Sequence, residues 1–315
     1  MSAEDEAAAW WHSKRARPPG LLVVSYGGGV DSVASLVYLH RIGEPPPAAI
    51  VMADPGSEKA PTWAYVREWM NPRLRKWGWP ELTVISRKQE GLLRAQQKGR
   101  GRRFETLYEE CMRIKALPSI AYGPKKCSQK YKGEPQRWWA DRQPWAHAEW
   151  AAGRKLVKAI GYDFDEPKRV QRSVTVMTPP PLRPEGHVGP WPRDRHKWER
   201  DRFDLWFPVF EARLTRAMCE ELIQSERMPV PPKSSCTFCP NNTLEEWIGL
   251  RENDPDVFAA AVEMSRNAVD NIDNTDDVGL MRCNRSGSRQ LHEWADGKYS
   301  KVGGGEVAIA CECAT

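Results

Sequence analysis

A glycine-rich string near the N-terminus is the clearest chemical pattern in the chain. It reads Ser25-Tyr26-Gly27-Gly28-Gly29-Val30-Asp31-Ser32 and lies between an apolar run, 21–24, and a segment with apolar residues at helical spacing. Glycines allow a tight turn in which backbone N–H groups approach phosphate oxygens, and a helix start adds favourable partial charge. We expect Ser25 and Ser32 to donate hydrogen bonds to those oxygens, and Asp31 to brace the loop by accepting backbone N–H groups.

The chain has eight cysteines, and some of them form a second candidate site. A Cys-x-x-Cys pair followed by proline supplies two thiolates that can bind one ion or one cluster, and the other ligands must come from a distance. A four-thiolate set suits either Zn²⁺ or a [4Fe–4S] cluster, while isolated buried thiols are the remaining alternative. The predicted ligands are Cys127, Cys236, Cys239 and Cys283, with Cys111 as a substitute.

Strands that alternate with helices are predicted to position these residues. The pattern indicates an α/β fold with a parallel twisted sheet flanked by helices, and a ligand site at the carboxyl ends of the strands. Residues 87–133 read as a basic, irregular loop or lid with helical stretches around Glu105–Ile114, and 134–152 as one helix. The expected strands are 21–24, Ala48–Ala53, Leu82–Ser86, Lys155–Ile160 and Leu205–Phe210.

Three regions are predicted. Residues 1–19 are a flexible basic arm, 20–212 a nucleotide-binding domain, and 213–315 a small helical lobe with the Cys-x-x-Cys pair and a cysteine tail. Thr215 is expected to cap a helix, and Cys219 to lie in the core.

Bulk composition is that of an ordinary folded protein with a basic excess. Lysine and arginine number 47 against 42 acidic residues, which gives a net charge of +5, so a phosphate-bearing partner such as DNA or RNA is plausible. No apolar run approaches the roughly 18 residues that span a bilayer, and the acidic N-terminus is unlike a signal peptide. We therefore expect a cytoplasmic protein without a membrane partner, in which cysteines serve as metal ligands or reactive thiols.

With its serines and aspartate, the string resembles the S-G-G-x-D-S signature of the PP-loop ATP pyrophosphatase superfamily, which has an adenine nucleotide alpha hydrolase-like fold. The resemblance is specifically to the phosphoadenosine phosphosulfate reductase-like branch, and it covers residues 20–270 in blocks. Further matching blocks are Ala53-Asp54-Pro55-Gly56-Ser57-Glu58, Leu117–Gly123 with Cys127, Lys132 with Pro135, Gly161-Tyr162-Asp163 with Glu166 and Arg169, Pro231–Pro240, and Glu246-Trp247.

The resemblance implies that the loop holds the β,γ-pyrophosphate of ATP while a nucleophile attacks the α-phosphorus. It assigns the pyrophosphate to Ser25, Gly27, Gly28, Gly29, Asp31 and Ser32. It places Asp54 near nucleotide or Mg²⁺, with a turn-forming role as the alternative. Lys132 and Arg169 would neutralise developing phosphate charge, unless they are ordinary surface charges. Sulfur-handling relatives use iron–sulfur clusters, which favours [4Fe–4S] over a zinc site.

The chain is therefore predicted to be an ATP-dependent adenylating enzyme that transfers sulfur from a donor protein to a nucleic acid (DNA or tRNA) or a small molecule. A sulfonucleotide reductase is the alternative within enzymes. Such reductases end in E-C-G-x-H, whereas Glu312-Cys313 is followed here by Ala314-Thr315, so Cys313 is a candidate nucleophile without the full motif. A non-catalytic, zinc-stabilised nucleic-acid-binding module is the third alternative.

Overall fold

The structure is a computed structural model of the chain. It describes residues 17–98, 104–123, 126–179, 196–273, 275, 278–283 and 287–297, with the backbone alone at 282–283 and 287–288. Cys311, Cys313 and most of the predicted N-terminal arm lie outside the described residues.

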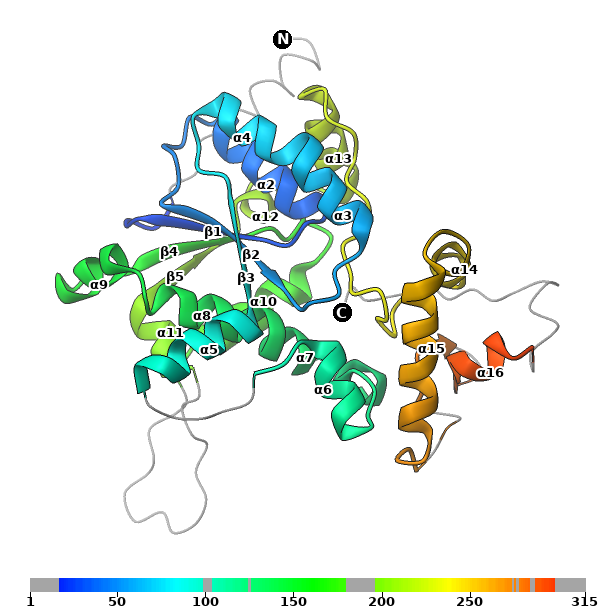
Figure 1. Ribbon diagram of the computed structural model, residues 1–315. Coiled ribbons are helices and arrows are strands. Elements are labelled where there is room, and N and C mark those ends of the chain that lie inside the picture. Colours follow the sequence, from blue (N-terminus) through cyan, green and yellow to red (C-terminus); the bar gives the residue numbers. More distant parts are fainter. Residues whose placement is uncertain are drawn as a thin grey trace.

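Five parallel strands form the central sheet, in the order β3-β2-β1-β4-β5 (Figure 1). β1 and β2 are apolar runs buried on both faces, as the middle strands of a covered parallel sheet require. The predicted fold class is thereby confirmed. The strands are β1 (Leu22–Tyr26), β2 (Ala49–Asp54), β3 (Leu82–Ser86), β4 (Leu156–Ile160) and β5 (Phe203–Trp206).

The strand order reverses between β1 and β4. The chain runs outward from β1 through β2 to β3, and then returns to place β4 on the other side of β1. Loops leaving two neighbouring strands in opposite directions open a crevice at their carboxyl ends, which is where ligands bind in such sheets. The glycine string follows β1 at this position.

Helices cover both faces of the sheet (Figure 1). One apolar cluster joins β1 and β4 to α2, to the helices after β2 and to α13, whose Thr215 accepts a hydrogen bond from Met218 as the predicted cap. Cys219, fully buried, belongs to it. This layer comprises α2 (Val30–Arg41), α3 (Ala60–Tyr65), the π-helical η1 (Val66–Met70), α4 (Asn71–Trp77), α12 (Pro208–Glu211) and α13 (Arg216–Ser225).

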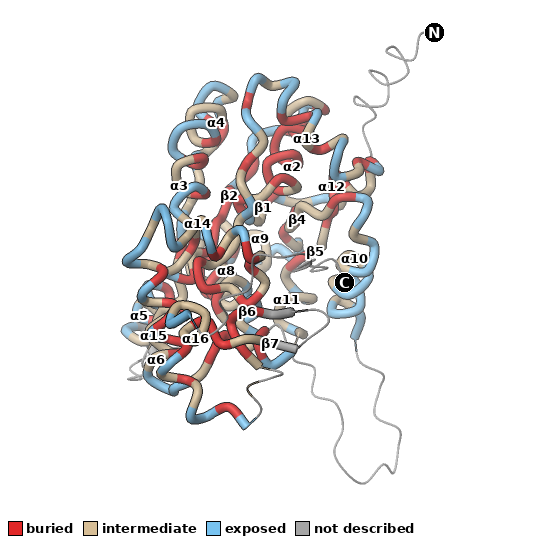
Figure 2. The backbone as a smooth tube through the Cα atoms, turned by 90° about the vertical axis from the view of Figure 1, so that its right-hand side faces the viewer, coloured by how far each residue is buried: buried red, intermediate tan, exposed pale blue. Residues whose placement is uncertain are grey.

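The opposite face of the sheet is covered by helices that lie between β3 and β5 in the sequence. The predicted single helix over 134–152 is divided into two helices. Proline lacks the N–H that a continuous helix needs at position 144, but its ring suits the first turn of a new helix, so Pro144 begins the second one. Figure 2 shows α10 at the surface, without a buried residue. These helices are α5 (Arg87–Lys98), α8 (Glu134–Ala140), α9 (Pro144–Ala151), α10 (Pro167–Met177) and α11 (Lys197–Arg202).

A second apolar cluster lies beside the sheet domain. It combines described residues of 107–131 with the C-terminal helices. A capping box starts one helix in each part, at Thr106 and at Thr243. The two predicted C-terminal helices, 244–250 and 255–271, are present. The elements are α6 (Leu107–Ile114), the 3₁₀ turn η2 (Ser119–Tyr122), α7 (Lys126–Ser128), the π-helical η3 (Gln129–Gly133), α14 (Leu244–Asn253), α15 (Pro255–Val269), β6 (Met281–Cys283), β7 (Gly287–Arg289) and α16 (Leu291–Ala295).

Two local predictions were wrong. The helical stretch predicted around Glu105–Ile114 is present as α6, but the rest of 87–133 is not an irregular loop or lid. Its described residues are largely helical as well, and Tyr131 is buried in the second cluster. The predicted strand 205–210 ends at Trp206, since Pro208 starts α12 there. No described helix has the length and apolar character needed to cross a membrane.

Candidate nucleotide and thiol sites

The glycine loop leaves the start of α2 open to an anion. Gly29 is the residue before the helix, and no side chain caps the helix there. The Ser32 hydroxyl, which could serve the helix start, instead donates to the Gly29 carbonyl oxygen at 2.8 Å. The first amides of α2 therefore point towards the crevice without a side-chain acceptor, which is the arrangement that binds phosphate at helix N-termini.

Two glycines make this close approach possible. Gly28 has a φ of +82°, and a Cβ there would lie 2.7 Å from the Thr62 methyl carbon. Gly161, which follows β4, has no room either, because its Cβ would lie 2.5 Å from the carbonyl oxygen of Asp31. Side chains at these positions would push the loop or helix α2 out of place.

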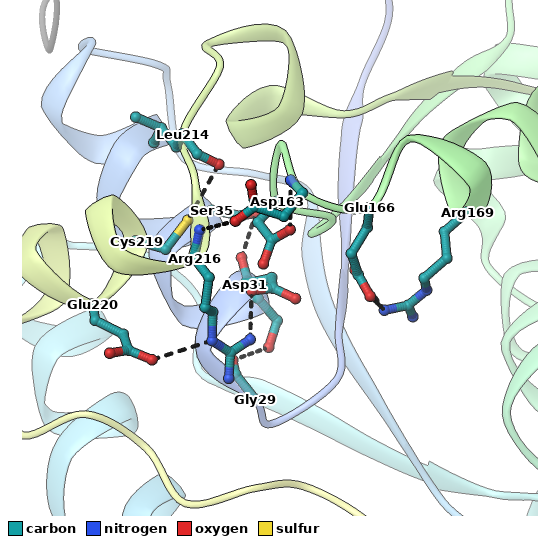
Figure 3. A network of polar contacts seen from close by, with 12 residues as sticks. Gly29, Asp31, Ser35, Asp163, Glu166, Arg169, Leu214, Arg216, Cys219 and Glu220 are labelled. Atoms are coloured by element: carbon teal, nitrogen blue, oxygen red, sulfur yellow. Dashed lines mark hydrogen bonds and ion pairs between the residues drawn. The ribbon is translucent and has the colours of Figure 1, made fainter. Parts of the chain in front are cut away.

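Asp31 makes a contact that sequence reasoning missed. Its Oδ1 accepts a hydrogen bond at 2.9 Å from Arg216, at the start of α13, rather than bracing the loop through backbone amides (Figure 3). Burial raises the pKa of Asp31, and Arg216 opposes that shift. Arg216 is about half exposed, with 47% of its side-chain surface accessible, so its charge is not fully shielded from solvent.

A second carboxyl group from the end of β4 lies in the same network. Asp163 is buried, and its Oδ1 accepts a hydrogen bond at 3.0 Å from the amide of Asp165, whose carboxylate accepts one from the amide of Arg216 (Figure 3). Burial, followed by repulsion from Asp31 and Glu166, raises the pKa of Asp163 to about 7. The crevice thus contains a carboxyl group that titrates near neutral pH.

Arg169 is held away from the loop. Its guanidinium pairs with Glu166 at 2.6 Å and lies 4.3 Å from the centre of the Tyr162 ring. Figure 3 shows this pair on the side of Asp163 away from Arg216. Arg216 makes the direct contact with Asp31 at the start of α2, whereas Arg169 acts on Asp31 electrostatically. The role predicted for Arg169 stays a prediction.

The other predicted loop residues have partners within the protein. Ser25 donates to Gln136 on α8 at 3.0 Å, and Asp54 accepts the Gly56 amide at 2.7 Å in the turn-forming geometry that was its alternative role. Lys132 pairs with Glu58 at 3.4 Å. Burial lowers the pKa of Lys132, but the nearby Glu58 and Cys236 raise it by more, so the amine keeps its charge.

Three of the candidate cysteines gather in the second apolar cluster. Cys111 is buried in this cluster, and the partly buried Cys127 and Cys236 pack against the same cluster. Burial raises the pKa of the Cys111 thiol to about 12, and the neighbouring Cys127 and Cys236 add to this shift. Burial raises the pKa of Cys236 to about 11, while Lys132 lowers it. Lys132 also interacts electrostatically with Cys239, so all four thiols lie in one neighbourhood.

The thiols are nevertheless not arranged as a finished metal site. Within the described part of the chain, no three Cys, His, Asp or Glu side chains are close enough to hold a metal ion. Cys283 ends β6, but its side chain is outside the described residues, as is the tail with Cys313. The structure therefore brings Cys111, the predicted substitute, into the group with Cys127 and the Cys-x-x-Cys pair.

The residues that sequence reasoning missed differ in the signals that they carried. Asp163 and Glu58 stand at the ends of matched motifs, directly after β4 and after the turn that follows β2. Ser234 stands two residues before Cys236 in another. Arg216 had no local signal, because only tertiary packing of α13 against α2 brings it to Asp31.

Comparisons with known proteins add little at the level of the site. The sequence matches no protein-family model and no curated protein. Among solved structures, the chain is similar to the U34-tRNA thiolase NcsA from Methanococcus maripaludis with its [4Fe-4S] cluster. The identity is 12% over 96% of this chain and 89% of that chain, with a TM-score of 0.35. A similarity at this TM-score carries no argument about the site. A parallel sheet with a glycine loop at its switch point is the arrangement that the resemblance to PP-loop ATP pyrophosphatases implies.

Proposed function

We propose that this protein is an ATP-dependent adenylating enzyme of the PP-loop type that transfers sulfur to an acceptor. The observation that carries the proposal is the uncapped start of α2 at the β1–β4 switch point, where backbone amides can hold a pyrophosphate group. An acceptor oxygen would bond to the α-phosphorus of ATP as the bond to the bridging oxygen breaks and pyrophosphate leaves. A sulfur nucleophile would then displace AMP from the activated acceptor.

The chain's own residues would divide this work. The amides at Gly27–Gly29 and the hydroxyls of Ser25 and Ser32 would hold the leaving pyrophosphate, with Mg²⁺ bound to its oxygens. Asp31 would keep its place through Arg216, whose half-exposed guanidinium would offset negative charge as the α-phosphorus is attacked. Lys132, which Glu58 holds beside the thiols, would offset part of the rise that burial causes in the pKa of Cys236.

The thiol group fits a soft-metal centre in its chemistry. Cys111, Cys127 and Cys236 share an apolar cluster, and Cys239 lies near Lys132, as Cys236 does. Burial keeps such thiols protonated, and a bound metal would stabilise their thiolate forms. We propose these four as the ligands of a [4Fe–4S] cluster, with Zn²⁺ as the alternative. A cluster would supply a sulfur- or electron-carrying centre beside the nucleotide, whereas zinc would only hold the segments together.

A nucleic acid is the acceptor that the charge distribution favours. Helix α10 follows Asp163 directly at the crevice and has no buried residue. Residues 167–177 include Lys168, Arg169 and Arg172 and no acidic residue. A sulfur-donor protein remains part of the proposal.

Release of pyrophosphate from labelled ATP tests this function. We expect wild-type protein to release pyrophosphate with a candidate acceptor present, and Ser32→Ala and Asp31→Ala each to lower the rate by about tenfold or more. Turnover of phosphoadenosine phosphosulfate without ATP consumption would establish the reductase alternative instead. Nucleic-acid binding that survives both substitutions, without nucleotide turnover, would establish the non-catalytic module.

A further inference from the structure

A buried carboxylate, that of Glu58, contacts groups at both the phosphate loop and the thiols, and so far its only role has been to hold Lys132. The side chain of Glu58 has no exposed surface. Its Oε1 is within hydrogen-bond distance of the Thr62 and Ser234 hydroxyls, at 3.3 and 2.9 Å, and its Oε2 lies 3.4 Å from the amine of Lys132. A charge buried this completely is stable only with such partners, so its contacts are strongly constrained.

The partners of Glu58 come from both candidate sites. Lys132 interacts with Cys236 and Cys239. Ser234 touches the phosphate loop, since its hydroxyl lies 2.5 Å from the Gly27 carbonyl oxygen and only 3.2 Å from where a Cβ of Gly28 would be. One side chain therefore connects to the loop through Ser234 and to the thiols through Lys132.

The backbone makes the same connection. Glu58 forms an isolated antiparallel bridge with Cys236. Hydrogen bonds on either side of it run from Thr237 to the Ser57 carbonyl at 2.8 Å and from Lys59 to the Ser235 carbonyl at 3.2 Å. The thiol segment is thus paired with the segment that follows β2, and cannot move without disturbing Glu58.

The Ser234 hydroxyl has two acceptors but only one proton. It can donate either to the Gly27 carbonyl or to Glu58, and both are within reach. A phosphate that draws the loop amides towards it would turn the Gly27 carbonyl and change which of the two accepts that proton. A buried acceptor left without a donor costs free energy, so a change in the hydrogen bond of Ser234 would shift the backbone of the segment that contains Cys236.

We propose that Ser234 and Glu58 are positioning residues that couple occupation of the phosphate loop to the placement of Cys236 and Cys239. This inference rests on the proposed function, because it requires ATP to bind at the loop. It adds that nucleotide binding orders the thiol segment, so that the thiols are in place when an activated acceptor forms.

Amide hydrogen exchange with and without saturating ATP·Mg²⁺, measured on the full chain as purified, tests the coupling. In wild-type protein we expect ATP to slow exchange at residues 25–32 and also at 232–240. In Ser234→Ala, the loop should keep its response while the response at 232–240 falls by about fivefold or more. Ser235→Ala is the matched control, because its neighbouring hydroxyl contacts Asn242 at 3.4 Å and not the loop.

A second variant separates coupling from simple damage to the fold. Glu58→Gln keeps the shape of the side chain but removes its charge, and should weaken the response at 232–240 while ATP still protects the loop. If wild-type protein responds only at the loop, or if Ser234→Ala behaves like Ser235→Ala, the inference is overturned while the proposed function stands. If wild-type protein shows no response at the loop, the proposed function fails and the inference fails with it.

Discussion

The phosphate loop and the thiol group are built in opposite ways. The loop is a continuous segment between β1 and α2, and the groups proposed to bind an anion there are backbone amides fixed by two secondary-structure elements. The thiol group comes from three separate segments. Cys111, Cys127 and Cys236 belong to or pack against one apolar cluster, and Cys239 lies near the same lysine as Cys236. The first site is therefore set by local geometry, whereas the second depends on how distant segments pack.

The comparison also concerns charge. Around the loop, carboxylates and arginines pair closely, as Asp31 does with Arg216. Around the thiols, Cys236 and Cys239 both act on the pKa of Lys132, and Glu58 pairs with the same amine. Substitutions that fill space at the loop should therefore impair its function more than substitutions of exposed charged residues. Metal binding by the thiol group should require each of its segments.

The largest effect is expected from filling the space at the loop. Gly28→Ala should lower ATP affinity by at least about tenfold and pyrophosphate release by about a hundredfold, because the methyl group would overlap Thr62 in a left-handed conformation. Isothermal titration calorimetry and a pyrophosphate assay would measure both. Gly43→Ala is the control, since Gly43 also has a positive φ, +71°, but has open space around it. Equal losses in the two variants would show that strain, not loop shape, is responsible.

Removal of a single thiol should test whether the second site is assembled from distant segments. We expect Cys111→Ser to lose most of the bound metal, because a thiolate ligand is missing from a four-thiolate set. Cys283→Ser should retain it. Metal analysis and visible absorption of anaerobically purified protein would decide between iron and zinc at the same time. Loss of metal in Cys283→Ser with retention in Cys111→Ser would restore the assignment made from the sequence.

Stability should depend on pH through Asp163. Its pKa of about 7 in the folded protein is raised above the ordinary value of 3.8, so between these values the folded state holds a proton that the unfolded state has lost. Its contribution to the free energy of unfolding must then fall as pH rises from about 4 to 7, by up to about 1.4 kcal/mol per pH unit, and level off above.

Asp163→Asn should remove that slope. Urea unfolding of wild type and variant across this pH range would measure the difference between them, which should grow with pH. The exposed Asp256→Asn serves as the control. A difference that is constant with pH would contradict the assignment to Asp163.

The smallest effect is expected at Arg216. Because 47% of its side chain is exposed, solvent screens its pairing with Asp31, and Arg216→Ala should lower kcat/KM for ATP by only about two- to fivefold. Glu220→Gln removes a carboxylate from the other side of the same guanidinium, 3.2 Å from Nε, and should leave kcat/KM unchanged. A loss above a hundredfold in Arg216→Ala would mean that the arginine contributes far more to the reaction than a solvent-screened cation can.

Contiguous features could be predicted from the sequence. The apolar runs, the glycine string and Thr215 predicted the parallel sheet, the loop at the end of β1 and the start of α13, because each depends on neighbouring residues with a fixed hydrogen-bond pattern. Within 87–133 only the helix around 105–114 was predicted, since the basic residues in the rest of the segment mask buried positions such as Tyr131.

Contacts between distant segments required the folded chain. Nothing near Arg216 in the sequence indicates Asp31, and nothing near Cys111 indicates Cys236. The spacing of residues along one helix or loop is set by backbone geometry, whereas these meetings are set by how α13 packs on α2 and how α6 packs beside the Cys-x-x-Cys segment. Side-chain packing across the whole fold sets the positions of Arg216 and Cys111. The phosphate loop could therefore be predicted from its own residues, whereas the groups that surround it could not.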